Sequence, residues 1–421
     1  MPAPPHGHDA YAALRDSNYR RFALGHLLSS TALQMFATTV SWELYARTGS
    51  AMALGYIGLA RVIPVLILAL PAGHAADTLD RRRVLTSTQA GFALLITLAA
   101  WLSYVTAPIW VYYFVIMGMG CARAFNGSSR NALLPLIVPP EAFTNAVTWN
   151  SGVFHASAVA GPLFAGLAYW WTGLAWPVYA LCALGCAAFA LATATLTPVT
   201  AQARSGAAMS LRAMGAGLGH LRRERTVLAA ITLDLFAVLF GGATAMLPVF
   251  AKDILGVGEV GHGMLRAAPF AGALVMSFVL AHRAPIRRNG RALLWAVGCF
   301  GAATIAFGLS TNFVLSLTAL LLAGAADNIS VVIRHVLVQV RTPDELRGRV
   351  GAVNTLFIES SNELGAFESG VVAALTTPMI SVVSGGGATV LVVACVAARW
   401  PELRRLGSLH PQEKPRHAKA G

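Results

Sequence analysis

Charged residues are scarce in this sequence. Only 12% of its 421 residues are Asp, Glu, Lys or Arg, about half the share that a soluble domain carries. Hydrophobic residues make up 56% of the chain and gather in long runs such as 22–43, 108–126 and 313–326. A helix needs about 20 mostly apolar residues to cross a bilayer, where it satisfies its own backbone hydrogen bonds. The shortage of charge excludes an ordinary soluble protein and predicts an all-α membrane protein.

Cysteines and catalytic motifs are also in short supply. The five cysteines all fall inside apolar runs, so they predict packing rather than a disulfide framework or a metal site. The sequence holds no nucleophile elbow, phosphate loop or His-Glu metal motif, which argues against an enzyme and against any cofactor. It also holds no nucleotide-binding domain, so ATP hydrolysis by this chain is not expected to supply energy for its activity.

Twelve apolar segments have the length of transmembrane helices. Their basic flanks, such as 81–83, 287–288 and 404–405, fall on one side, whereas Arg47 and Lys252 fall on the other. The positive-inside rule then predicts that both termini are cytoplasmic. The net charge of +13 reflects this topology and does not indicate nucleic-acid binding. We place the segments near 22–44, 52–75, 84–104, 108–132, 144–171, 175–197, 227–251, 261–281, 292–311, 313–338, 350–375 and 378–398.

The two halves of the chain resemble each other. A shift of 204 residues maps the fourth and fifth segments onto the tenth and eleventh without a gap. It pairs several residues of the same type, among them Gly120 with Gly324, Arg130 with Arg334, Gly161 with Gly365 and Gly166 with Gly370. Parallel six-span repeats are typical of the major facilitator fold, in which the substrate binds between two six-helix bundles related by a pseudo-two-fold axis. We therefore divide the chain into a cytoplasmic tail (1–21), a six-helix bundle (22–197), a cytoplasmic linker with an amphipathic helix (198–226), a second six-helix bundle (227–398) and a cytoplasmic tail (399–421).

The turn between the second and third segments carries a polar and basic motif over residues 73–83. It resembles the hallmark cytoplasmic motif of the major facilitator superfamily at Gly73, Asp77, Arg81 and Arg82. Thr78 departs from it, because the family usually has a basic residue there. The resemblance implies that Asp77 belongs to an inner gate, neutralised in the closed state by a helix N-terminus and an arginine. The alternative is a positively charged turn without a gating role.

The fifth segment carries Gly161, Pro162 and Gly166, which resemble the Gly-Pro signature of the antiporter branch of this superfamily. Small residues allow helices to approach closely and proline permits a bend. The alternative is tight packing without any meaning for the direction of transport.

Longer stretches at 48–60, 234–245, 326–334 and 361–370 resemble the bacterial enterobactin-exporter-like branch of the superfamily. The resemblance runs from Arg15 to Leu406. It implies a monomeric exporter of small organic molecules in the bacterial cytoplasmic membrane, commonly driven by proton entry. Glu43, Glu359 and Ala366 depart from the usual text of this branch, so the pattern of carboxylates differs from that of relatives.

Ionisable residues inside spans are costly in lipid and are therefore functional candidates. Glu359 and Glu363 lie one helical turn apart, and two close carboxylates resist double ionisation. These two and Asp234 are our candidates for proton coupling. The alternative is that each acid forms a structural pair with an arginine, and the sequence leaves these partners open. Our candidates for charges lining the cavity are Arg61, Arg123, Asp327 and Glu368.

Together these patterns predict a proton-coupled exporter of drug-like or siderophore-like molecules that works by alternating access. Its expected partners are a small-molecule substrate, protons and the lipid bilayer. The alternatives are an importer of a small metabolite and a transporter-like sensor.

Overall fold

The computed structural model describes residues 11–197, 219, 224–284 and 286–408. The predicted amphipathic helix of the linker lies largely outside these residues. Among the described residues, the side chains left out are those of Leu70, Ala76, Asp77, Asp344, Glu345, Arg349 and Ala352.

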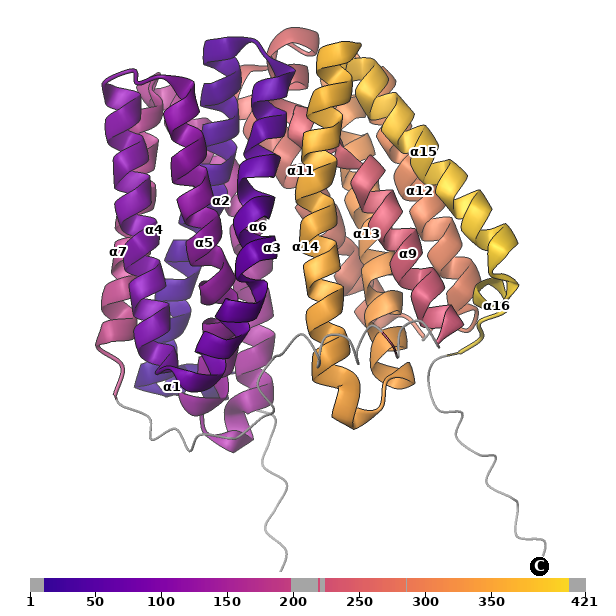
Figure 1. Cartoon of the computed structure of the whole chain (residues 1–421), viewed down its shortest axis with the longest axis horizontal. Coiled ribbons are helices and arrows are strands. Elements are labelled where there is room, and N and C mark those ends of the chain that lie inside the picture. The colour runs from indigo at the N-terminus through magenta and orange to yellow at the C-terminus, as the bar shows by residue number, and fades with distance from the viewer. Residues whose placement is uncertain (1–10, 198–218, 220–223, 285, 409–421) are drawn as a thin grey trace, which may run out of the picture. The chain divides into compact units, whose positions relative to one another are not determined.

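The described part of the chain is built from helices and contains no strand (Figure 1). The first half of the sequence forms α1 (Ala12–Arg15), α2 (Ser17–Thr48), α3 (Ala51–Thr78), α4 (Arg81–Tyr104), α5 (Ile109–Leu133), α6 (Phe143–Thr172) and α7 (Ala175–Ala194). The second half forms α9 (Arg225–Phe240), α10 (Leu247–Val249), α11 (Gly258–His282), α12 (Asn289–Leu309), α13 (Phe313–Arg341), α14 (Asp344–Leu375), α15 (Pro378–Arg399) and α16 (Pro401–Arg404).

Local sequence explains where several of these helices begin and end. Asp80 caps α4, because its carboxylate accepts hydrogen bonds from the backbone N–H groups of Arg82 (2.9 Å) and Arg83 (3.3 Å). Asn312 caps α13 in the same way. Helices α2 and α6 are followed by Gly49 and Gly173, whose φ angles of 60° and 66° lie in the left-handed region that suits glycine.

Nine helices within the described residues are long and apolar enough to cross a membrane. One of these candidate spans, Arg225–Ile254, is not a continuous α-helix. After α9 the chain forms a 3₁₀ segment (Gly242–Met246), then α10 and a π-turn (Phe250–Ile254). The sequence predicts an uninterrupted span over 227–251. The break falls at Gly241 and Gly242, because adjacent glycines weaken a helix and allow the backbone to leave it.

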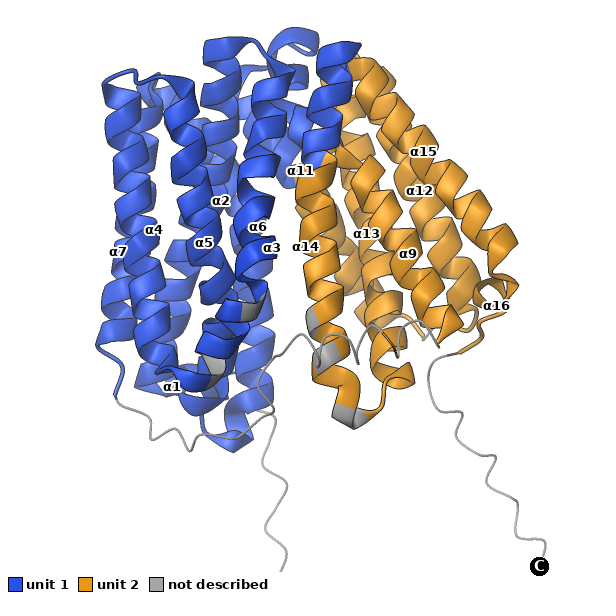
Figure 2. Ribbon diagram, viewed as in Figure 1, with its two compact units in different colours: residues 1–211, 244–267, 366–378 blue, residues 212–243, 268–365, 379–421 orange. Residues whose placement is uncertain are grey.

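The chain divides into two compact units, drawn in different colours in Figure 2. Unit 1 comprises residues 1–211, 244–267 and 366–378. Within it, α2 packs against α6 and α7, α4 packs against α5 and α7, and α3 packs against α5. Unit 1 also includes the start of α11 and the end of α14. The second half of the sequence therefore contributes directly to its packing.

Unit 2 comprises residues 212–243, 268–365 and 379–421. Within it, α12 packs along α13, while α9 contacts α12, α13 and α16. Glycine permits some of these approaches: a Cβ on Gly324 of α13 would lie 1.9 Å from the carbonyl oxygen of Pro269 in α11. The apolar core of this unit includes Val227, Leu293, Leu337 and Leu403, all fully buried.

Candidate functional site

The motif at 73–83 lies where α3 ends and α4 begins. Asp77 is in the last turn of α3. The Arg81 guanidinium donates a hydrogen bond to the carbonyl oxygen of Ala132 (3.3 Å), in the last turn of α5. Arg82 donates to the carbonyl oxygen of Leu196 (2.5 Å), just beyond α7. Carbonyl groups at a helix C-terminus carry partial negative charge, which cations stabilise. The two arginines therefore tie the start of α4 to the ends of two neighbouring helices.

The Gly-Pro motif of α6 lies at two close helix contacts inside unit 1. A Cβ on Gly161 would lie 2.5 Å from the Cβ of Gln34 in α2, and one on Gly166 would lie 2.6 Å from the carbonyl oxygen of Glu259 in α11. The carbonyl oxygen of Pro162 would be 2.4 Å from a Cβ on Gly263, also in α11. Any larger residue would push these helices apart. The motif thus brings α6 against both α2 and the start of α11.

Side chains from the end of α2 and from residues 252–262 form a second set of contacts in unit 1, which we call the closure layer. The hydroxyl group of Tyr45 donates to the Asp253 carboxylate, and the Lys252 ammonium donates to the carbonyl oxygen of Ala46 (3.3 Å). The ring of Trp42 stacks on that of His262, with their centroids 5.4 Å apart. The closure layer lies at the end of unit 1 opposite the turn between α3 and α4, because α2 and α3 run in opposite directions from residue 49.

Buried Glu43 is a polar centre that our site assignment from the sequence missed. Its carboxylate accepts hydrogen bonds from the hydroxyl groups of Tyr179 (2.7 Å), Ser103 (2.8 Å) and Tyr112 (3.1 Å), and it pairs with Arg47 at 3.4 Å. These donors come from α7, α4, α5 and α2. The available signal was a lone acid inside the apolar run 22–44. Its donors could not be identified, because they lie up to 136 residues away in the sequence.

Each unit contains one of the two arginines that the repeat pairs. In unit 2, Arg334 of α13 forms an ion pair with Asp234 of α9, and both side chains are buried. In unit 1, Arg130 of α5 is hydrogen-bonded to Nε2 of His26 in α2, at 2.8 Å. The sequence left the partner of Asp234 open. The structure pairs it with Arg334, which fits the alternative of a structural ion pair for this acid.

The remaining charged candidates of this group lie on α3, α5 and α14, and its three acids all belong to α14. Arg61 is partly buried on α3, whereas Arg123 is exposed on α5. Glu359 and Glu363 are both partly buried on α14. Near them along α14, the Glu368 carboxylate accepts a hydrogen bond from the hydroxyl group of Ser369 at 3.4 Å. These four residues and Glu368 keep the roles predicted for them as predictions.

Arg123 belongs to unit 1 and Asp327 to unit 2, and the role of Asp327 as a cavity charge also stays a prediction. Within the described part of the chain, no group of three or more His, Cys, Asp or Glu residues is arranged to hold a metal ion.

A model of the Major Facilitator Superfamily matches residues 22–366 of this chain. Three curated proteins are similar to it in sequence. The uncharacterized MFS-type transporter y4rN of Sinorhizobium fredii is 26% identical and covers 89% of this chain and 93% of its own length. Macrolide efflux protein A of Streptococcus pyogenes is 24% identical, covering 60% and 62%. Enterobactin exporter EntS of Escherichia coli is 22% identical, covering 94% of both chains.

Two solved structures share the fold. The nucleoside transporter NupG superposes with a TM-score of 0.73 at 13% identity, covering 91% of this chain and 99% of its own. A bacterial homolog of the human lysosomal transporter Spinster, in an inward-facing conformation, superposes with a TM-score of 0.71 at 14% identity, covering 93% and 97%. At this level of identity the likeness shows the fold alone.

Proposed function

This chain belongs to the Major Facilitator Superfamily and is a multi-pass membrane transporter rather than an enzyme, and we propose that it is a proton-coupled exporter of small organic molecules. The proposed cycle is alternating access of two six-helix bundles, which together supply twelve spans. We further propose that it works as a monomer in the bacterial inner membrane, with both termini in the cytoplasm.

The observation that carries the proposal of alternating access is the glycine contact between α6 and α11. Gly166 and Pro162 of the first half approach the backbone of Glu259 and Gly263 of the second half within unit 1. Only small residues permit this approach. A contact that consists of backbone on backbone has few side chains to rearrange, so the two segments can separate and rejoin. The closure layer adds polar contacts at the same segments, since Lys252, Asp253 and His262 flank Glu259.

Export is supported by two of the relatives, which are named as a macrolide efflux protein and an enterobactin exporter. The second of these matches over nearly the full length of both chains. An amphiphilic organic molecule of the macrolide or siderophore class is therefore our proposed substrate. Arg61, Arg123, Asp327 and Glu368 are the charges that we propose for its cavity.

The inner gate in this proposal is centred on Asp77. Arg81 and Arg82 hold the adjacent start of α4 against the ends of α5 and α7. The segment that follows Asp77 is therefore attached to α5 and to the end of α7. We propose that the Asp77 carboxylate forms or releases a contact with a second element as the gate closes or opens.

Proton coupling in this proposal uses carboxylates of α14 and α9. Glu363 is the first candidate and Glu359 the second, because they lie one turn apart and are partly buried. Asp234 enters the cycle through its ion pair with Arg334. A proton on Asp234 would remove its negative charge and weaken the ion pair with Arg334. Protonation would thereby be coupled to a movement of α13 against α9.

The test is proton movement in everted membrane vesicles whose lumen has been acidified by respiration. Adding a macrolide, or in a second assay enterobactin, is expected to release protons from the lumen, followed with a pH-sensitive dye. Glu363→Gln is expected to abolish this release but to leave downhill substrate exchange measurable. Glu141→Gln is the matched control, because it makes the same change at an exposed glutamate in the short 3₁₀ turn that precedes α6.

Three results would contradict parts of the proposal. Proton movement in the opposite direction would indicate an importer that works by symport. If neither the macrolide nor enterobactin moves protons, the protein does not exchange these two molecules for protons. If Glu363→Gln, Glu359→Gln and Asp234→Asn all release protons like the wild type, the coupling site lies elsewhere.

A further inference from the structure

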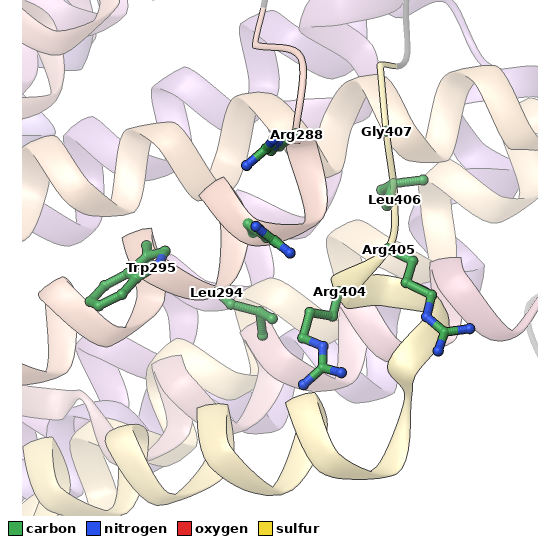
Figure 3. A pocket seen from close by; sticks show the side chains of 8 residues that line it. Arg288, Leu294, Trp295, Arg404, Arg405, Leu406 and Gly407 are labelled. Atoms are coloured by element: carbon green, nitrogen blue, oxygen red, sulfur yellow. The ribbon is translucent and has the colours of Figure 1, made fainter.

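A cavity in unit 2 gathers four arginines from two separate segments. It lies where α12 begins and where the chain leaves α15 through α16, and it has a volume of about 650 Å³. Figure 3 shows side chains from both segments around it. Its lining consists of Arg288, Arg291, Leu294, Trp295, Arg404, Arg405, Leu406 and Gly407.

The segment that carries Arg404 and Arg405 is held firmly against α12. The side-chain amide of Asn289 donates to the carbonyl oxygen of Gly407 (3.0 Å). The backbone N–H of Gly290 donates to the carbonyl oxygen of Leu406 (3.1 Å). A Cβ on Gly290 would lie 1.7 Å from the carbonyl oxygen of Leu403, which is itself fully buried. The arginines of both segments are therefore placed around the cavity by the backbone, before any ligand binds.

Within the described ranges, no acidic side chain is paired with the arginines of this cavity. Among the residues that the structure describes, none of its four guanidinium groups has a carboxylate within salt-bridge distance. The acid on α16, Glu402, instead pairs with Arg225 at 3.9 Å. Four like charges around one cavity repel each other, and an anion between them would relieve this repulsion. The planar guanidinium fork matches phosphate oxygens in particular, because it donates two parallel hydrogen bonds.

The surroundings of the cavity favour a lipid phosphate over a soluble one. Helix α12 is itself a candidate membrane span, Asn289–Leu309, so its first turn lies where lipid head groups would meet the protein. Trp295 lies one turn further along, with 75% of its surface exposed. Tryptophan is enriched at the level of the head groups, and basic pockets at the ends of spans bind anionic head groups. Leu294 and Leu406 add an apolar edge beside the arginines.

We propose that this cavity binds the head group of an anionic phospholipid, and that a lipid with two phosphates binds more tightly than one with a single phosphate. The four arginines hold the phosphates, and Trp295 lies beside the glycerol and the upper acyl chains. The bound lipid would fasten the C-terminal segment and the start of α12 to one leaflet. Binding at this site does not depend on the direction of transport or on the coupling ion.

The test is lipid binding by the full-length protein, purified in detergent and stripped of lipid. It would be titrated with diphosphatidylglycerol and, separately, with phosphatidylcholine, and the bound lipid would be counted by native mass spectrometry. The wild type is expected to bind diphosphatidylglycerol in clear preference. A hydrogen bond between a guanidinium group and a phosphate contributes about tenfold to affinity, so Arg291→Gln combined with Arg404→Gln should weaken binding about 100-fold.

The matched control combines Arg283→Gln with Arg287→Gln. Both residues are exposed in the loop before α12 and do not line the cavity. Their substitution removes the same amount of positive charge as the cavity variant. The control should bind within about twofold of the wild type. Gly290→Ala retains all four arginines but displaces the segment that carries Leu403, and it should also weaken binding.

Two outcomes would overturn the proposal. Equal losses in the cavity variant and in the control would mean that only the total positive charge attracts lipid. Inorganic phosphate could also compete with the lipid. If it displaces the lipid when the two supply equal concentrations of phosphate groups, in the millimolar range, the cavity binds a soluble anion instead.

Discussion

The two halves of this protein use equivalent arginines in different ways. Arg130 and Arg334 are 204 residues apart, and each contacts the first long helix of its own half. Arg334 meets the carboxylate of Asp234, whereas Arg130 meets the imidazole of His26. The same shift moves His26 to position 230, so the two partners differ by one helical turn as well as in chemistry. Repetition of the arginine did not repeat its electrostatic environment.

This difference in partners means that the stability of the two halves depends on charge at different places. The ion pair of unit 2 is buried on both sides, so neither charge can return to water if the other is lost. In unit 1, Arg130 donates a hydrogen bond to an imidazole nitrogen of His26. Removing the arginine there leaves a neutral ring, and removing the histidine leaves one charge. Buried carboxylate in unit 1 is found instead at Glu43, which hydroxyl groups and Arg47 surround.

The largest expected effect comes from Asp234→Ala. Losing one partner of a buried ion pair leaves an uncompensated charge and costs about 3–5 kcal/mol of the free energy of unfolding. The measurement is thermal unfolding of the purified protein in detergent. Asp234→Ala combined with Arg334→Ala should cost less than the sum of the two single changes. Strictly additive losses would mean that the two side chains do not depend on each other.

The next effect compares glycines that the repeat pairs. A Cβ on Gly324 would lie 1.9 Å from the carbonyl oxygen of Pro269, whereas one on Gly120 would lie 3.1 Å from the Cγ of Pro64. We expect Gly324→Ala to cost about 3 kcal/mol, the upper part of the range for overpacking. Gly120→Ala should cost less than about 1 kcal/mol. Equal losses of thermal stability in the two variants would contradict this difference between the halves.

A smaller loss is expected from His26→Ala. It removes a hydrogen bond to a partly buried arginine, which contributes about 2 kcal/mol. Chemical unfolding, followed in parallel with Asp234→Ala, measures the two costs under the same conditions. The comparison between the halves fails if the histidine variant is destabilised as strongly as the aspartate variant.

The smallest effect on stability is expected from Asp77→Asn, which conserves the shape of the side chain. A change that keeps the size of the side chain and removes only one charge is expected to shift the free energy of unfolding by less than about 1 kcal/mol. Transport should nevertheless fall about tenfold, because the gate loses its negative charge. The measurement is the rate of proton release per folded protein in everted vesicles. Full activity at normal expression would remove the gating role from Asp77.

Much of the fold could be predicted because it depends on local patterns. Long apolar runs indicated membrane helices, and the structure places a helix or a helical segment at each of them. The same shift of 204 residues that pairs Gly120 with Gly324 also maps the start of α5, Ile109, onto the start of α13, Phe313. The break after α9 was missed, because two glycines inside an apolar run do not reveal whether packing will keep the helix intact.

The candidate site was less accessible to prediction from sequence. The motif at 73–83 could be located, but the carbonyl groups that receive Arg81 and Arg82 lie on α5 and beyond α7. The acid Asp234 could be selected by its cost in lipid, but its partner lies 100 residues further along the chain. Glu43 was noticed only as a departure from relatives, because its importance depends on three hydroxyl groups from three other helices.

By itself the sequence determined that this chain enters a membrane as helices, and it showed that residues of the same type recur at a shift of 204 positions. The first property depends on the hydrophobicity of runs of about 20 residues, and the second can be read from the residue types alone. Tertiary structure alone decided that Arg334 meets Asp234 while Arg130 meets His26, and that four arginines share one cavity at the start of α12. The physical reason is that a buried charge is stabilised by whichever groups the packed helices bring within a few ångströms. The spacing of residues along the chain does not determine these distances.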